Sequence, residues 1–278
     1  MAQGAATTAQ PTPPAPSPVA SAWPGLGRTG VPAGTHLVAS GSITITAAGT
    51  VIDARDVNGC ISVEASSVTI KRTRVRGGFC STNQIYIAPG HSAIRIEDTE
   101  VDGLNQNSFY AGIGGSGFTC LRCDIHNVGQ GFNINGEFNI VIQDSYVHDL
   151  FTCCGSHNED IYVGDSFPAS ITIRHNRLDN ADGQTAAISL FADFGPIEHV
   201  TVDHNLLNGG GYTLYGGSTC PKPYCSQTSD IVVTNNHFGR LFFANCGQYG
   251  PVIAFDPTLP GNVWSRNIWD DTKEPISP

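Results

Sequence analysis

The 278-residue chain contains little charge and very little lysine: charged residues make up 14% of it, and only three residues are Lys. Its formal net charge is −10 at pH 7. Nucleic acids and anionic membranes bind proteins that present a basic face. The composition therefore argues against both as partners, whereas a polyanionic substrate would need a local Arg, His or metal site to offset the negative field.

The chain also lacks a long apolar run, so neither a transmembrane helix nor the hydrophobic region of a signal peptide is visible. Residues 2–25 are mainly Ala, Thr, Pro and Ser, a composition typical of disordered segments. We expect a leader or linker over residues 1–30 and a single domain over residues 31–278. The whole is typical of a mature secreted protein with an added initiating Met.

One short pattern recurs along the domain: apolar, any, apolar, two polar residues, a small residue or Asn, any, apolar. The segment SITIRHNRL, residues 170–178, shows it most clearly. Eight copies are visible at intervals of 22 to 31 residues, and a unit that repeats on this scale signals a solenoid. The sixth positions of the copies are Thr73, Thr99, Cys123, Ser145, Asn176, Asn205, Asn236 and Asn267.

Each copy predicts a short strand, a sharp corner and a second strand. Asn tolerates the left-handed backbone region, and coils about 4.8 Å apart would let successive corner Asn side chains hydrogen-bond as a ladder. A third strand precedes each copy, as in DIYVGD at residues 160–165. Three strands in each coil predict a three-sided solenoid. The alternative, an antiparallel sandwich, predicts hairpin turns every 8 to 12 residues or so, in place of one repeated corner.

The repeat predicts a buried corner residue and a stacked core column. Asn205 should be buried and hydrogen-bonded to neighbouring coils. The inward apolar residues should form one stacked column in the core, made of Ile70, Ile96, Ile142, Ile173, Val202 and Val233.

Nine cysteines beside a single Met favour an oxidising, extracellular location, and their odd number leaves at least one thiol unpaired. Cys220 and Cys225 close a tight loop and are predicted to pair. Cys60 and Cys80, one coil apart, are a second candidate pair. The CxxC motif that begins at Cys120 occupies inward positions of the repeat, so we favour core packing or a local disulfide over a zinc or redox site.

Three strands per coil, the Asn-rich corner, the segment GTVIDARDVNGCISVEASSVTI (residues 49–70) and long loops on one edge resemble a known superfamily. The chain is similar to the right-handed parallel β-helices of the pectate lyase-like superfamily, especially secreted bacterial members, over roughly residues 35–271. The resemblance implies an all-β, right-handed parallel β-helix of three sheets and about eight to nine coils. It also implies a substrate groove along the third strand and its long loops.

The resemblance does not transfer one activity, because this superfamily includes polysaccharide lyases, glycoside hydrolases, uronan epimerases, esterases and phage tailspikes. The polygalacturonase sequences NTD, GHG and RIK and the pectate lyase sequence WIDH are missing. The segment SHNEDIY is similar to a His-x-x-Asp-like segment at the same strand start in uronan epimerases and related enzymes.

Alternation places candidate chemistry on the third strand of one coil. With Ile161 facing inward, Asp160 and Tyr162 should face outward, beside small residues in the neighbouring coils. The preceding loop supplies His157 and Glu159, and a His beside several carboxylates suits proton transfer. Alternatively, His157 only caps its turn by bonding loop amides.

The candidate residues follow from this placement. His148 leads into the long loop and should lie one coil from His126, and we count it among the catalytic candidates. The other catalytic candidates are His157, Glu159, Asp160, Tyr162 and Asp182. The candidate substrate-binding residues are Asn133, Asn135, Gln184 and Tyr215.

Three functions are compatible with these residues. In a polysaccharide lyase on a uronate-containing glycan, His157 or Tyr162 would remove the proton α to the carboxylate, while Ca²⁺ held by Asp160 and Asp182, or an Arg or His, would offset the enolate charge. In a glycoside hydrolase, two carboxylates from Glu159, Asp160 and Asp182 would act as a pair. In a non-catalytic β-helix, the same residues would bind a polysaccharide or oligosaccharide without turnover. The sequence favours the lyase, with a monomer acting outside the cell.

Overall fold

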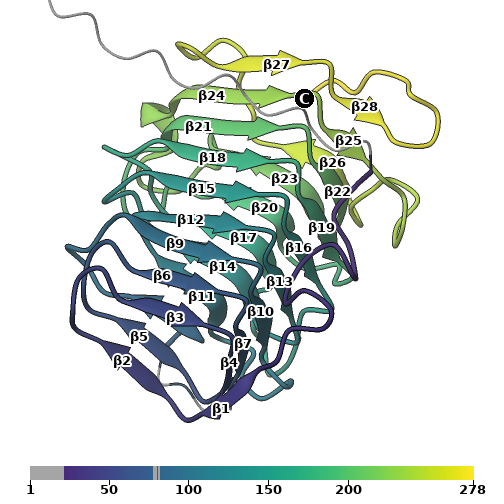
Figure 1. The fold of residues 1–278 in the computed structure, drawn as a ribbon. Helices are drawn as coiled ribbons and strands as arrows, with labels where there is room; N and C mark the ends of the chain where they lie inside the picture. Colours follow the sequence, from purple (N-terminus) through teal and green to yellow (C-terminus); the bar gives the residue numbers. More distant parts are fainter. Residues whose placement is uncertain (1–21, 78–79, 81) are drawn as a thin grey trace, which may run out of the picture.

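The computed structural model describes residues 22–77, 80 and 82–278. Its strands form three all-parallel sheets, named here A, B and C, which wind into the expected right-handed parallel β-helix (Figure 1). Within the described residues the one helical element is a 3₁₀ turn, η1 (Cys225–Gln227). None of these residues form a helix that is long and apolar enough to cross a membrane.

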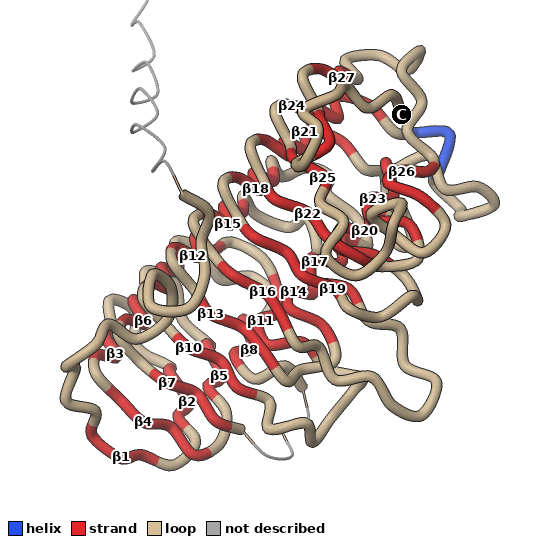
Figure 2. Tube along the Cα trace, turned by 90° about the vertical axis from the view of Figure 1, so that its right-hand side faces the viewer, coloured by secondary structure: helices blue, strands red, loops and turns tan. Residues whose placement is uncertain are grey.

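Each coil contributes one strand to sheet B, then one to sheet C, then one to sheet A, and Figure 2 shows the coils stacked along the solenoid. Sheet A contains β1 (Val38–Ser40), β4 (Arg55–Asn58), β7 (Arg74–Arg76), β10 (Glu100–Asp102), β13 (Asp124–His126), β16 (Tyr146–His148), β19 (Arg177–Asn180), β22 (Leu206–Gly209), β25 (His237–Phe238) and β28 (Ile268–Trp269).

Sheet B contains β2 (Ile43–Ile45), β5 (Ile61–Val63), β8 (Ile85–Ile87), β11 (Ala111–Gly115), β14 (Gln130–Ile134), β17 (Glu159–Val163), β20 (Ala186–Leu190), β23 (Tyr212–Gly216) and β26 (Gly250–Ile253). Sheet C contains β3 (Val51–Asp53), β6 (Thr69–Lys71), β9 (Ile94–Glu97), β12 (Phe118–Leu121), β15 (Ile140–Gln143), β18 (Ile171–Arg174), β21 (Glu198–Asp203), β24 (Ser229–Thr234) and β27 (Val263–Ser265).

The predicted core column is confirmed by the register of sheet C. Ile70 pairs with Ile96, and Ile142 pairs with Ile173, which in turn pairs with Val202. Val202 pairs with Val233, and Cys120 occupies the place between Ile96 and Ile142. The members are buried, so the repeat read from the sequence has the correct register along the whole solenoid.

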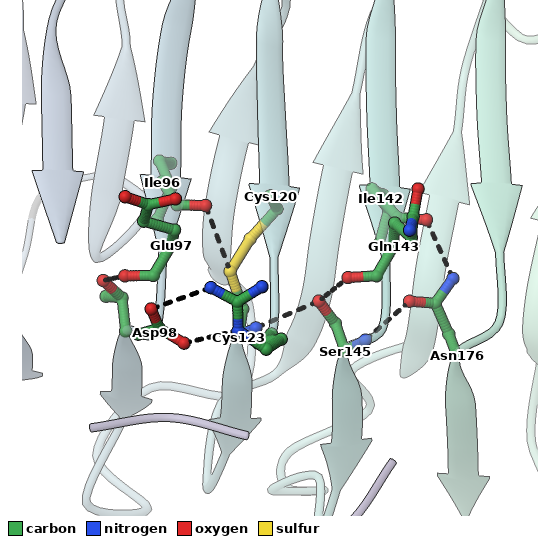
Figure 3. Close-up of a disulfide and its surroundings, with 11 residues drawn as sticks. Ile96, Glu97, Asp98, Cys120, Cys123, Ile142, Gln143, Ser145 and Asn176 are labelled. Carbon is green, nitrogen blue, oxygen red and sulfur yellow. Dashed lines mark hydrogen bonds and ion pairs between the residues drawn. A yellow bond between two sulfur atoms is a disulfide. The ribbon is translucent and has the colours of Figure 1, made fainter. Parts of the chain in front are cut away.

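The corner ladder between sheets C and A is also confirmed. The Asn205 side chain is fully buried, donates hydrogen bonds to the Ile173 carbonyl (3.0 Å) and Asn236 Oδ1 (2.9 Å), and accepts one from the Asn176 backbone amide (2.9 Å). Figure 3 shows the start of the ladder, where Ser145 accepts from the Cys123 amide and donates its own amide proton to Asn176 Oδ1. Small residues therefore continue the ladder where Asn is absent.

The cysteines form four disulfides, Cys60–Cys80, Cys120–Cys123, Cys153–Cys154 and Cys220–Cys225. The two predicted pairs are confirmed, and so is the local disulfide at the CxxC motif, which Figure 3 shows. Cys246 keeps a buried free thiol. The pairing of the adjacent Cys153 and Cys154 was not foreseen.

The leader expected over residues 1–30 lies partly outside the described residues. Residues 22–30, by contrast, pack on the outside of the coils. The Gly30 amide donates to the Arg122 carbonyl at 2.8 Å. The Trp23 ring lies 5.0–5.6 Å, centroid to centroid, from the imidazoles of His175, His204 and His237. This segment, called the Trp23 strap below, is part of the folded domain.

Candidate active site

The outer face of sheet B carries the candidate site, but strict alternation fails within its strands. In β17, Asp160 and Ile161 are both fully buried, while Tyr162 is half-buried. The next coil repeats this arrangement, because Ala187 and Ile188 both belong to the hydrophobic core. In both coils two successive residues therefore face the interior.

Because of this irregularity, the side chain of Glu159, and not that of Asp160, lies on the groove side of β17. Its side chain is only 2% exposed, and Gln130 Nε2 on β14 donates to its Oε2 at 2.6 Å. Burial, reinforced by the negative charge of Asp193, raises the pKa of Glu159 to about 7, although Gln130 and Lys222 oppose the shift. Glu159 is therefore a carboxyl group that exchanges its proton near neutral pH, which suits general acid catalysis.

Asp193 and Lys222 form an ion pair beside Glu159. Lys222 Nζ lies 2.6 Å from Asp193 Oδ1, and the Tyr162 hydroxyl donates to Asp193 Oδ2 at 2.9 Å. The Lys222 ammonium also lies 4.8 Å from the centroid of the Phe191 ring, a cation–π contact. Burial, followed by the hydrogen bond to Asp193, raises the pKa of Tyr162, so this hydroxyl is a poor base near neutral pH.

A cavity of about 580 Å³ opens on this face, where the loops enter strands β17, β20, β23 and β26. Here it is called the first cavity, and it is lined by His157, Gly183, Gln184, Thr185, Phe191, Gly211, Tyr215, Lys222 and Tyr249. Glu159 is not among these lining residues, but it follows His157 by two positions, and its partner on the neighbouring strand, Ala186, comes directly after Thr185. The cavity and Glu159 therefore belong to one site.

The structure brings together three of the predicted residues in the first cavity: His157, Gln184 and Tyr215. His157 Nδ1 lies 3.4 Å from Thr185 Oγ1. Asn133 lies next to this group, because its amide donates to Gln130 Oε1 at 2.9 Å, and Gln130 holds Glu159. Their grouping follows from the coil register, but their catalytic and binding roles stay predictions.

Asp160 does not face the groove, so the predicted orientation of this side chain is wrong. Both of its carboxyl oxygens are buried without a hydrogen-bond partner. Gly131, its counterpart in the preceding coil, would direct a Cβ at the core residue Val147. Burial, together with the charges of Asp179 and Glu159, raises the pKa of Asp160 well above its usual value, so the group is held protonated.

The calcium site expected at Asp160 and Asp182 does not fit this geometry. Calcium needs several oxygen ligands that converge at about 2.3–2.6 Å. Asp160 offers no accessible oxygen, and Asp182 Oδ1 accepts the backbone amide of Gln184 at 3.0 Å, as in a turn cap. Among the described residues no group of three or more His, Cys, Asp and Glu is placed to hold a metal ion.

His148 lies elsewhere, on sheet A. The predicted register with His126 is confirmed, and the two rings stack with centroids 5.1 Å apart. Burial opposes protonation of His148, but hydrogen bonds to Asp124 (3.0 Å) and Asp149 (2.7 Å) outweigh it and raise its pKa. An imidazole held on both nitrogens by carboxylates is well suited to a structural ion-pair network, separate from the groove.

A second cavity, of about 540 Å³, lies where strands of sheet B end, and Asn135 is among its lining residues. Gln130, Asp193 and Lys222 are not among the residues that the sequence pattern predicted for the site. Gln130 could have been found, because it stands one coil before Glu159 in the repeat. Asp193 and Lys222 meet from different loops, and the repeat carries no signal for their contact.

A comparison of the chain with known protein families, with curated proteins and with solved structures found no match.

Proposed function

We propose that this protein is a secreted carbohydrate-active enzyme that cleaves a polysaccharide on the outer face of sheet B by hydrolysis, with Glu159 as the proton donor. The observation that carries the proposal is a carboxyl group with a pKa of about 7 beside an aromatic-lined cavity. The four disulfides support an extracellular location, and the coil architecture supports kinship with the pectate lyase-like superfamily.

In this mechanism the protonated Glu159 donates its proton to the glycosidic oxygen as the bond between that oxygen and the anomeric carbon breaks. A water molecule supplies the hydroxyl group of the new reducing end, and a carboxylate accepts the proton that this water releases. Asp193 is the candidate acceptor, because Lys222 and Tyr162 hold it in place beside Glu159. Phe191 and Tyr215 offer ring faces to the sugar.

A lyase on a uronate-containing glycan is the second candidate. The observation that favours it is the presence of Lys222 and His157 on the wall of the first cavity, which has no carboxylate among its lining residues. His157 would then be the base that removes the proton α to the uronate carboxylate. Lys222 would offset the charge of the enolate, in place of the metal ion expected from the sequence.

The experiment is a panel of polysaccharides read in two ways, by new reducing ends and by the ultraviolet absorbance of unsaturated products. Hydrolysis predicts reducing ends without absorbance, and β-elimination predicts both. Glu159→Gln should lower the rate at least about a hundredfold, whereas Glu198→Gln, on sheet C, should not change it. Full activity of the Glu159 variant would reject Glu159 as the proton donor. No turnover of any polysaccharide by the wild type would favour a binding role.

A further inference from the structure

The second cavity lies where strands of sheet B end, whereas the first lies mainly where they begin, and strands β17 and β20 border both. It is lined by Pro89, Asn135, Gly136, Glu137, Asp165, Phe167, Phe194, Gly195, Pro196 and Tyr224. Most of these residues follow directly after β14, β17 and β20, three successive strands of sheet B. The cavity is therefore built by the coil that carries Glu159 and by the coils on both sides of it.

Two phenylalanine rings at this cavity face solvent. Phe194 is 72% exposed and Phe167 is 56% exposed, and Tyr224 lines the same cavity. Large apolar rings gathered at one place on a surface mark a binding site more often than a solvated face. Flat ring faces suit the C–H faces of a pyranose, and a phenol adds one polar group.

The two carboxylates of the second cavity accept hydrogen bonds from backbone amides, which hold them in place. Both oxygens of Glu137 accept the Gly90 amide at 3.0 Å, and Asp165 Oδ1 accepts the Gly136 amide at 2.5 Å. The lining contains no Lys, Arg or His. Fixed carboxylates accept strong hydrogen bonds from hydroxyl groups, and they repel a second carboxylate.

Two loops lie between the cavities, and each loop contributes residues to both. The lining residues of the two cavities differ in charge. Phe191 lines the first cavity and Phe194 the second, on either side of Asp193. In the loop closed by the Cys220–Cys225 disulfide, Lys222 lines the first and Tyr224 the second. The residues that line the first cavity include His157 and Lys222 but no acid, although Glu159 and Asp193 adjoin it, whereas those that line the second include Glu137 and Asp165 but no basic residue.

We propose that the second cavity is a subsite for a neutral pyranose of the same glycan that is cleaved at Glu159. This inference rests on the proposed function for the identity of the ligand as a glycan. The sugar stacks on Phe194 and Phe167, and its hydroxyl groups donate to Glu137 and Asp165. A uronate at the same place brings its carboxylate against these two acids, so the groove selects against an unbroken run of uronates.

The test is isothermal titration calorimetry on the full chain with Glu159→Gln, so that binding is measured apart from turnover. The probes are β-linked hexasaccharides of glucose, mannose and xylose, together with hexagalacturonate as the uronate. We expect at least one neutral hexasaccharide to bind more tightly than hexagalacturonate. Adding Phe194→Ala should weaken that binding about tenfold, which corresponds to about 1.4 kcal/mol, because the variant loses the stacking of the sugar on the ring.

Phe109→Ala is the matched control, because Phe109 is 61% exposed and lines neither cavity. It should leave every affinity unchanged. Glu137→Gln should reduce the preference for the neutral probe over hexagalacturonate several-fold. The subsite is overturned if hexagalacturonate binds as tightly as every neutral probe, if no neutral probe binds at millimolar concentration, or if Phe194→Ala has no effect.

The turnover and binding experiments together distinguish a wrong proposed function from a wrong subsite. If Glu159→Gln keeps full turnover while Phe194→Ala still weakens the neutral probe, then Glu159 is not the proton donor and the subsite stands. If Glu159→Gln abolishes turnover and Phe194→Ala leaves binding unchanged, the proposed function stands and the subsite falls.

Discussion

Glu159 and Asp160 are neighbours in the chain, and their carboxyl groups lie on opposite sides of the wall of the solenoid. Glu159 accepts a hydrogen bond from Gln130 on the groove face, whereas Asp160 is fully buried without a hydrogen-bond partner. Both have a raised pKa with burial as the largest cause. Only Glu159 can exchange a proton with a bound ligand in this geometry.

The pH dependence of turnover should follow Glu159. A general acid is active when protonated, so kcat should be constant below its pKa and fall about tenfold per pH unit above it. With a pKa of about 7, the fall should begin near neutral pH. Steady-state rates from pH 5 to 9 on the substrate found in the panel will show this limb. A rate that rises through pH 7 would instead indicate that Glu159 acts as a base.

Asp160 should make the protein less stable as pH rises, whereas an acid in an ion pair makes a protein more stable as pH rises. Its pKa is raised in the folded state, so its contribution is fully present below the unfolded value near 3.8 and is lost as pH rises toward the folded pKa. From pH 4 upward, the free energy of unfolding of Asp160→Asn should therefore increase relative to that of the wild type, by at most about 1.4 kcal/mol per pH unit.

Urea unfolding of both proteins at several pH values measures this difference. We also expect Asp160→Asn to keep its turnover, because the side chain does not reach the groove. A pH-independent difference, or an inactive but folded variant, would contradict the interior placement of Asp160.

Asn205→Ala should lower the free energy of unfolding by about 1–3 kcal/mol. The substitution leaves the Asn176 backbone amide without its acceptor and removes the donor to the Ile173 carbonyl, and both groups are buried. Asn245→Ala, at an exposed position in a loop, is the control and should have no effect. Chemical unfolding measures both, and equal stabilities would show that the ladder does not support the fold.

Protonation of His204, which contacts the Trp23 strap, should lower the stability of the protein in acid. Burial, together with nearby His175, lowers the pKa of His204, so the folded state resists a proton that the unfolded chain accepts below about 6.5. Stability is therefore lost as pH falls below that value. We expect the Tm of His204→Gln to fall less than that of wild type between pH 7 and 5, by no more than about 2 °C, because the imidazole is only partly buried.

The matched control for the strap is His36→Gln, since His36 is exposed. Its Tm should follow wild type over the same pH range. If His204→Gln and His36→Gln behave alike, the contact of Trp23 with the three imidazoles does not couple to pH.

The sequence alone determined the solenoid, the register of its core column, the corner ladder and two of the disulfides. The solenoid, the column and the ladder depend on a local pattern that repeats once per coil, so a few neighbours are enough to place Ile173 or Asn205, whereas the two disulfides follow from the spacing of their cysteines. The grouping of His157, Gln184 and Tyr215 followed from the same register.

Tertiary structure alone decided which acid faces the groove and what surrounds it. Alternation with a period of two assigned Asp160 to the outside, but two successive residues of β17, as of β20, turn inward, and this exchanges the roles of Asp160 and Glu159. The ion pair of Asp193 with Lys222 joins loops 29 residues apart, and the strap places Trp23 on coils far along the chain. Such contacts depend on loop conformation and side-chain packing, which the period of a repeat does not encode.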